Sequence, residues 1–310
     1  MLFKNILIAS CFTLFGGMPS GVSAQEALDS IPFELGGDSR VYIRCRVNES
    51  DTLRFLFDSG ATDMVVNTQS EKAVRHLNFN EKGFNYGASG GNAVPVSTGN
   101  SFCGGGTRTD DLKFIGVPYP PEFWDGVVGL SFMKNFTVRL DYDRRMIYLY
   151  RPGTYKPDRR AVCLQIDYEM GVPVVPVKVC VNGTYYDLRL EVDLGSDRVL
   201  DLNTPFVKKQ KLLGSQQPFA ISRISSSDAN TGELQNVYFD EIVMGSLRLP
   251  RIPGAFSTVT EGVQASDKMD GVMGNNLLQR FHLTFDFANG YLYLEPNNLL
   301  YKPFYSFLIF

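Results

Sequence analysis

Two aspartates, Asp58 and Asp193, occur in the same local setting, at the end of an apolar segment and before a glycine turn. The first follows FLF and precedes Ser-Gly-Ala, and the second follows LEV and precedes Leu-Gly-Ser. An apolar strand that ends in a sharp turn would hold each carboxyl group close to the protein interior. Burial raises the pKa of a carboxyl group, and a second acid nearby raises it further. Such a pair could share a proton and activate a water molecule for attack on a carbonyl carbon.

The repulsion between the two carboxylates sets the size of this effect. Two carboxylates about 4 Å apart at an effective dielectric constant of about 20 repel by about 4 kcal/mol, which corresponds to roughly three pKa units. The ionised member can then take a proton from water, while the protonated member polarises the carbonyl oxygen. For either aspartate alone, the alternative is a turn residue that hydrogen-bonds its own backbone.

The two aspartates belong to an internal repeat. They lie 135 residues apart (193 − 58), and the segments DGVVG at Asp125 and DGVMG at Asp270 lie 145 residues apart (270 − 125). Each DGVxG segment is followed by two strand-like stretches. Each half therefore predicts a strand, an aspartate turn, a DGVxG element and a terminal hairpin, and this doubled set argues against two unrelated turns.

The doubled motif resembles the pepsin and retropepsin clan of aspartic peptidases, in which Asp-Ser/Thr-Gly lies between apolar strands and two apolar residues with Gly follow about seventy residues later. Over roughly residues 31–296 the chain is similar to a fused, two-lobed retropepsin-like protein of the bacterial exported type. The resemblance implies an all-β, two-lobed acid-protease fold (pepsin/retropepsin-like β-barrels) from an internal duplication. It also implies the following site: the catalytic residues Asp58 and Asp193, and two active-site loops with Ser59, Gly60, Ala61, Leu194, Gly195 and Ser196.

The resemblance further implies an aspartic endopeptidase that hydrolyses a peptide or protein substrate bound in an extended form. No cofactor, metal or covalent intermediate is expected for this chemistry. We expect a monomer, because the duplication supplies both halves of the active site in one chain.

One residue departs from the family pattern. In the family the residue after each catalytic aspartate is Thr or Ser, whose hydroxyl bonds to the opposite loop; Ser59 fits, whereas Leu194 has no hydroxyl. Losing one such bond should cost about 0.5–1.5 kcal/mol. The alternative function is therefore a catalytically degenerate two-lobed β-protein that binds extended peptides or an envelope polymer without cutting them. A structural envelope component is a third hypothesis, with the aromatic tail at residues 299–310 as its interaction surface.

A Gly-rich stretch, Gly83 to Gly106, separates the two motifs of the first half. The family places a flap over the substrate here, and Tyr86 and Gly87 would belong to it. A surface loop without a catalytic part is the alternative. The segment Ser222–Gly232 takes the matching place in the second half, where a plain surface loop is favoured. The tail is expected to add an edge strand.

The N-terminus predicts export. Lys4 precedes an apolar run, and Val-Ser-Ala precedes Gln25, as in a secretory signal peptide at residues 1–24. A lipoprotein anchor at Cys11 is disfavoured, because it would leave an apolar core of about four residues where roughly seven to fifteen are needed. We expect a periplasmic or secreted protein with an N-terminal lobe at residues 25–155 and a C-terminal lobe at residues 156–310.

Other chemistries find little support in this sequence. The chain has two histidines, and His282 lies on a predicted strand, so a Ser-His-Asp or Cys-His centre is disfavoured. No metal-ligand spacing or nucleotide-binding loop is found. The formal net charge of −3 provides no footprint for nucleic acid, and after the signal peptide no stretch predicts a transmembrane span. Trp124 is expected to pack in the core rather than contact a ligand.

The cysteines leave two alternatives open. Four remain after the signal peptide, and their spacing does not define a pairing. A bridge between Cys163 and Cys180 across a hairpin and buried free thiols are both consistent with the pattern. The four are Cys45, Cys103, Cys163 and Cys180.

Overall fold

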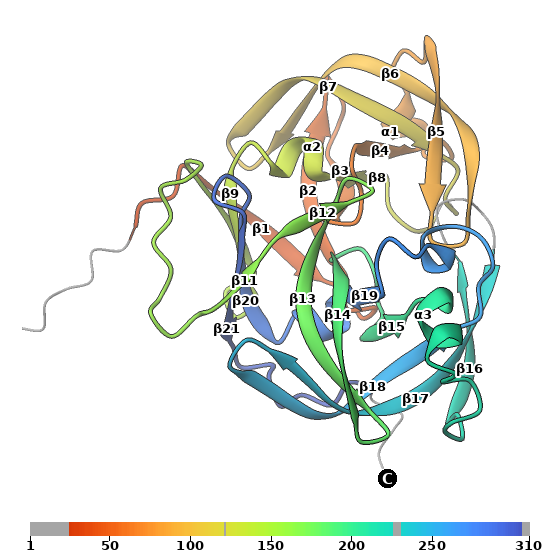
Figure 1. Cartoon of the computed structure of the whole chain (residues 1–310). Coiled ribbons are helices and arrows are strands. Elements are labelled where there is room, and N and C mark those ends of the chain that lie inside the picture. The colour runs from red at the N-terminus through yellow and green to blue at the C-terminus, as the bar shows by residue number, and fades with distance from the viewer. Residues whose placement is uncertain (1–24, 121, 226–230, 306–310) are drawn as a thin grey trace, which may run out of the picture.

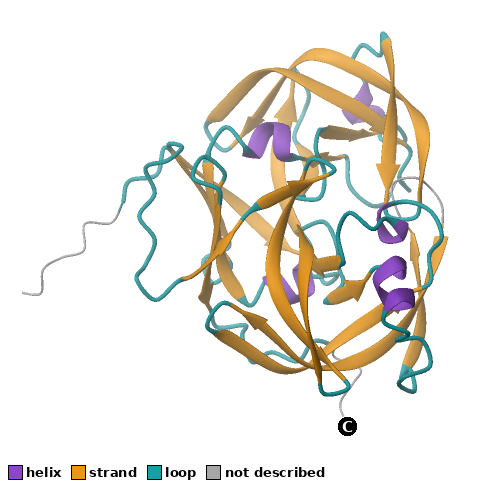
Figure 2. Ribbon diagram, viewed as in Figure 1, coloured by secondary structure: helices purple, strands orange, loops and turns teal. Residues whose placement is uncertain are grey.

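A computed structural model describes residues 25–120, 122–225 and 231–305 of the chain (Figure 1). β-strands make up most of these residues, and a few short helices lie beside them (Figure 2). The predicted signal peptide, Cys11 included, lies outside the described residues. In the described ranges no helix is long and apolar enough to cross a membrane.

The first half of the chain supplies ten strands and two one-turn helices to the described structure. In chain order they are β1 (Asp29–Leu35), β2 (Val41–Val47), β3 (Leu53–Phe57), β4 (Met64–Asn67), α1 (Glu71–Val74), β5 (Glu81–Gly87), β6 (Gly90–Gly104), β7 (Thr107–Val117), β8 (Gly126–Val128), α2 (Leu130–Met133), β9 (Thr137–Asp141) and β10 (Met146–Tyr150).

The second half repeats this succession, with two short strands at its start in the place of β1. In chain order its elements are β11 (Val162–Gln165), β12 (Asp167–Glu169), β13 (Val172–Val181), β14 (Thr184–Asp193), β15 (Leu200–Leu202), α3 (Thr204–Lys209), β16 (Ala220–Ser225), β17 (Thr231–Met244), β18 (Leu247–Ser257), the 3₁₀ turn η1 (Val263–Ala265), β19 (Gly271–Gly274), α4 (Asn275–Leu278), β20 (Phe281–Asp286) and β21 (Tyr291–Pro296).

The hydrophobic pattern explains the strands that carry the two aspartates. Strand β2 alternates buried and exposed residues over its second part, as expected for a strand with one solvated face. Strand β3 is buried or nearly so throughout and ends at Phe57, directly before Asp58. Because this strand is covered on both faces, its end is held firmly and the following turn has a defined position.

The strand pairings confirm the internal duplication. Strand β3 pairs in parallel with β8, and β14 pairs in parallel with β19 in the same register. The two DGVxG aspartates make matching bonds: Asp125 accepts a hydrogen bond from the Arg54 N–H at 2.8 Å, and Asp270 accepts one from the Arg189 N–H at 2.9 Å. The halves are therefore structural copies, as the offsets of 135 and 145 residues predict.

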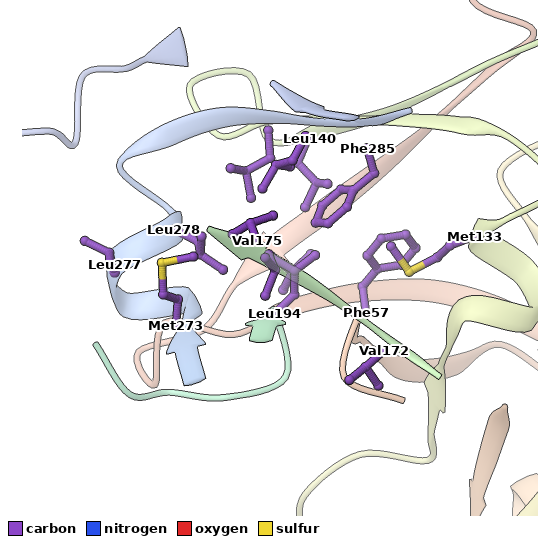
Figure 3. Close-up of a cluster of buried hydrophobic side chains, with 14 of the residues drawn as sticks. Phe57, Met133, Leu140, Val172, Val175, Leu194, Met273, Leu277, Leu278 and Phe285 are labelled. Atoms are coloured by element: carbon purple, nitrogen blue, oxygen red, sulfur yellow. The ribbon is translucent and has the colours of Figure 1, made fainter. Parts of the chain in front are cut away.

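The two halves share a sheet. Strands β1, β9 and β10 of the first half continue through β20, β21 and β11 of the second, with β20 paired antiparallel to β9. These strands lie together at the left side of the molecule in Figure 1, next to both lobes. The inner face of this sheet packs against a core with side chains of both halves, including Leu140 and Phe285 (Figure 3). The all-β, two-lobed architecture predicted from the sequence is therefore correct, while the lobe boundary at residue 155, which falls in the loop between β10 and β11, stays a prediction.

Two minor expectations differ from the structure. The described part of the tail, residues 299–305, forms turns and not an edge strand, because the buried Arg280 guanidinium gathers its carbonyl groups, including those of Leu299 and Leu300 at 2.9 and 3.3 Å; residues 306–310 lie outside the described ranges. Cys163 and Cys180 are not bridged, since β11 pairs with β21 and not with β13. All four described cysteines are free thiols.

The contacts of Trp124 and His282, which lie outside the carboxyl pair, indicate structural roles. Trp124 packs against Tyr42, Tyr119 and Phe123, in agreement with the predicted packing role. His282 on β20 faces Asp141 of the first half, with Nδ1 3.4 Å from a carboxylate oxygen. It therefore contributes to the junction of the halves.

Candidate active site

The structure brings Asp58 and Asp193 together at the junction of the two lobes. Asp58 follows β3, and its N–H donates to the Val128 carbonyl in β8 at 3.0 Å. Asp193 ends β14, paired with Gly274 of β19. Each aspartate is thus fixed by the parallel strand pair of its own half, and the repeat places the two in equivalent positions.

A single backbone N–H joins the two carboxyl groups. The Gly195 N–H donates to Asp193 Oδ1 at 2.8 Å and to Asp58 Oδ1 at 3.2 Å, so the two oxygens are within about 6 Å of each other. The carboxyl groups also hydrogen-bond to one another when one holds a proton. Further N–H groups complete each turn, from Gly60 to Asp58 at 2.7 Å and from Ser196 to Asp193 at 3.1 Å.

The two glycines of the loops are required by close approach across the junction. A Cβ on Gly60 would lie 2.9 Å from the Asp193 carboxyl carbon, and a Cβ on Gly195 would collide with the carboxyl group of Asp58. Any larger residue at either position would push the opposite aspartate away. The glycine after each Asp-x pair therefore permits the two acids to meet.

Burial raises the pKa of both acids, and the charges of neighbouring acids add to the rise for Asp193. Each aspartate keeps some exposed surface, but the surrounding protein removes most of the water from its carboxyl group. For Asp58, burial raises the pKa, while hydrogen bonds and the positive charge of Arg40 act against this rise. For Asp193, burial comes first and the negative charges of Asp58 and Glu191 add to it, so its pKa lies well above the ordinary value. Asp58 is therefore the more readily ionised of the two.

The residues after the two aspartates behave differently. Ser59 is completely buried; its hydroxyl donates to the Val192 carbonyl at 2.5 Å and accepts from the Leu194 N–H at 3.1 Å. Leu194 instead inserts its side chain into the core beside Phe57 and Val175 (Figure 3). Of the two hydroxyl contacts to the opposite loop that the motif predicts, the one from Ser59 is thus present, and packing of Leu194 in the core replaces the other.

The last residues of the two loops are tied to the DGVxG elements in the same way. The Ala61 carbonyl accepts a bond from the Leu130 N–H at 2.8 Å, and the Ser196 carbonyl accepts one from the Asn275 N–H at 2.8 Å. These donors lie at the starts of α2 and α4. The loops are therefore anchored at both ends within their own halves.

Two residues near the pair were missed in the sequence analysis. Arg40, directly before β2, donates from Nε to the Gly195 carbonyl at 2.6 Å and lies 3.3 Å from Asp38 and 3.5 Å from Asp197. No sequence signal marks Arg40, because its partner lies 155 residues away. The second, Glu191, has a visible signal: it occupies the place of the apolar Leu56 in the repeat, within a strand predicted to be buried.

The Gly-rich stretch of the first half forms a hairpin that reaches the second lobe. Strands β5 and β6 are joined at Ala88 and Ser89, and the Ala88 carbonyl accepts a hydrogen bond from the Gln264 N–H at 3.1 Å. Gly262 lies so close to this tip that a Cβ there would collide with the Gly90 nitrogen. Tyr86, with 49% of its surface exposed, points to solvent from the hairpin. The hairpin tip therefore contacts the second lobe.

Other parts of the described structure do not extend the candidate site. The turn of the second hairpin, β16–β17, falls partly on residues 226–230, outside the described ranges. A surface cavity of about 480 Å³ beside Trp124 contains none of the predicted site residues. Among the residues described by the structure, no group of three His, Cys, Asp or Glu side chains has the arrangement of a metal site.

Comparison with known proteins supports the fold. The chain is similar to the crystal structure of aspartic proteinase from Irpex lacteus, with a TM-score of 0.56, over 88% of this chain and 98% of that chain. No family model and no curated protein matches the sequence. The chain therefore has the two-lobed fold of an aspartic proteinase, and at 11% sequence identity the likeness extends to the fold alone.

Proposed function

We propose that this protein is an exported aspartic endopeptidase that hydrolyses peptide bonds with Asp58 and Asp193. The observation that carries the proposal is the Gly195 N–H, which bonds to the carboxyl groups of both aspartates and so places them side by side at the junction of two repeated lobes. A pair of turn residues with only local roles would not need to meet across 135 residues of chain.

The electrostatics assigns a role to each acid. Asp58 accepts two backbone N–H bonds and feels the positive charge of Arg40, so it carries the negative charge and takes a proton from the attacking water. Asp193, whose pKa is raised further, holds the shared proton and donates a hydrogen bond to the carbonyl oxygen of the peptide. As the two groups are coupled, the pair titrates as a unit.

Substrate entry requires the β5–β6 hairpin to move. Its tip is hydrogen-bonded to Gln264 of the second lobe, so an extended peptide must displace this contact before it can lie across both lobes. Such a flap would close again over the bound peptide and exclude water from the reacting carbonyl. Because one chain carries both aspartates, a monomer suffices for the reaction.

Cleavage of an unfolded protein substrate between pH 3 and 8 tests this function. We expect the mature chain to cleave, and both Asp58→Asn and Asp193→Asn to lose at least about a thousandfold in rate, because neither acid alone can serve as base and acid. Asp51→Asn is the matched control, since it makes the same chemical change in an exposed turn. If wild type and variants were all folded and equally inert, the degenerate peptide-binding protein would replace this proposal.

Export is tested separately. The full chain expressed in a bacterium should be recovered outside the cytoplasm with Gln25 as its first residue, as measured by mass spectrometry of the intact protein. A product that keeps Met1 and stays in the cytoplasm would contradict the signal peptide without affecting the proposed chemistry.

A further inference from the structure

A third carboxyl group lies against the aspartate pair. Glu191 precedes Asp193 by two residues on β14, so both side chains project from the same face of the strand. Glu191 has only 5% of its surface exposed, and its Oε1 lies 3.1 Å from the position of a Cβ on Gly60. Its carboxyl group therefore reaches across the junction to the loop that carries Asp58.

Among the residues that the structure describes, no cation pairs with Glu191. Strand β14 lies between β13 and β19, where the residues beside Glu191 are Val174 and Val272. The only basic side chain two residues away on the strand, Arg189, is paired with Glu169 at 2.8 Å. Within the described part of the chain Glu191 makes no ion pair, and the charged groups that face it are the two acids of the pair, with Arg40 beyond them at Asp58.

The chemistry of this position follows from its surroundings. Burial and the negative charge of Asp58 raise the pKa of Glu191 to about 8. At neutral pH the group is therefore a neutral acid with an O–H that can donate, whereas the first half has the hydrocarbon side chain of Leu56 at the equivalent position. A neutral packing residue would have served for stability alone, since a buried carboxyl group without a cation is costly.

We propose that Glu191 is a positioning residue whose buried carboxyl group, once it ionises beside Asp58 and Asp193, keeps the aspartate pair in its one-proton state to higher pH than the two aspartates would reach alone. The proposal rests on the proposed peptidase function and concerns the pH range of that same site. Glu191 is thus a third carboxyl group whose protonation is coupled to that of the aspartate pair, but it contacts no reacting atom.

The direction of the effect follows from the proton count. With three coupled carboxyl groups, a single negative charge leaves two protons in the site, and the loss of a further proton from either Glu191 or the pair makes the next loss harder. An ionised Glu191 can only raise the pH at which the pair loses its shared proton, because like charges repel. Removing the carboxyl group must therefore move the alkaline limb of activity to lower pH and leave the acid limb in place.

The first measurement is the pH profile of cleavage for wild type, Glu191→Gln and Glu191→Leu. In both variants we expect activity at pH 9, where Glu191 is ionised in the wild type, to fall about tenfold relative to activity at pH 4.5, the change that corresponds to one pH unit in the alkaline limb. Glu49→Gln, which makes the same change at an exposed position, should keep the wild-type profile. Glu191→Leu takes its residue from the other half of the repeat and covers the case in which a buried glutamine prevents folding. Unchanged profiles in the folded variants would overturn the proposal.

The second measurement separates this inference from the peptidase function. Carbon-13 NMR titration of the side-chain carboxyl groups, with the resonance absent in Glu191→Gln assigned to Glu191, follows the proton whether or not the protein cleaves anything. We expect Glu191 to titrate above pH 7, and the Asp193 resonance to titrate at lower pH in the variant than in wild type. A Glu191 resonance that titrates near pH 4.5, or an Asp193 titration that does not move, would overturn the inference even in an active enzyme. An inert protein with the expected titrations would overturn the peptidase function alone.

Discussion

Replacing Glu191 by glutamine should stabilise the protein relative to wild type, and this advantage should increase as the pH rises. The pKa of Glu191 is about 8 in the folded protein and 4.5 when the group is solvated, a difference of about 3.5 (8 − 4.5). At about 1.36 kcal/mol per pKa unit, the folded wild type forfeits up to about 5 kcal/mol by keeping this group from ionising. A typical domain has only about 5–15 kcal/mol of stability, so the effect is large.

The sign and the pH range follow from proton binding. Below about pH 4.5 the group is protonated in both the folded and the unfolded chain and contributes no pH dependence. Between about pH 4.5 and 8 the unfolded chain binds fewer protons than the folded one, so the free energy of unfolding falls as pH rises. Glutamine has no such dependence, and the variant should gain on the wild type throughout this range and keep a constant advantage above it.

Urea denaturation at half-unit steps from pH 4 to pH 9 measures this difference. The free energy of unfolding of Glu191→Gln minus that of wild type should rise by about 3–5 kcal/mol across the range, whatever its value at pH 4. Glu49→Gln, at an exposed site, should show a flat difference. A flat difference for Glu191→Gln as well would refute the reasoning, since it would mean that Glu191 is ionised in the folded protein.

Three further predictions concern the junction of the lobes. Ser59→Ala should lower the free energy of unfolding by about 2–4 kcal/mol, because two buried backbone groups lose their partner; a loss below about 0.5 kcal/mol in urea denaturation would show that water replaces the hydroxyl. Leu194→Ala should cost about 2–5 kcal/mol in the same assay, as for other fully buried leucines, and a cost near zero would contradict its role in the core. Gly262→Ala should detach the flap tip, because this glycine has φ of 77° and a Cβ there meets the Gly90 nitrogen; amide exchange at residues 83–96 should become at least about tenfold faster, and unchanged exchange would show that the contact does not hold the flap.

The local pattern of apolar and polar residues was sufficient to predict much of the fold. The alternation of RVYIRCRV and the uninterrupted FLF correctly indicate a half-solvated strand and a buried one, because side-chain direction alternates along a strand whatever lies around it. The repeat predicts two equivalent strand–turn units, and the matching bonds of Asp125 and Asp270 follow. For its described part, residues 299–305, the tail was wrongly expected to form a strand, because aromatic residues favour strands but the buried Arg280 binds carbonyl groups of this segment in a turn conformation.

By itself the sequence determined that the chain is a duplicated all-β protein with one aspartate at the end of a buried strand in each half. This conclusion depends on the order of residues and on hydrophobic periodicity, both of which can be read within short segments of the chain. Only the tertiary structure decided which groups surround the pair: the shared Gly195 N–H, the hydroxyl contact of Ser59 with the opposite loop and the uncompensated carboxyl group of Glu191. The contacts across the junction join residues more than a hundred positions apart and depend on how the two halves pack, so local patterns do not encode them. Only Glu191, an acidic residue where the first half has the apolar Leu56, leaves a local signal in the sequence.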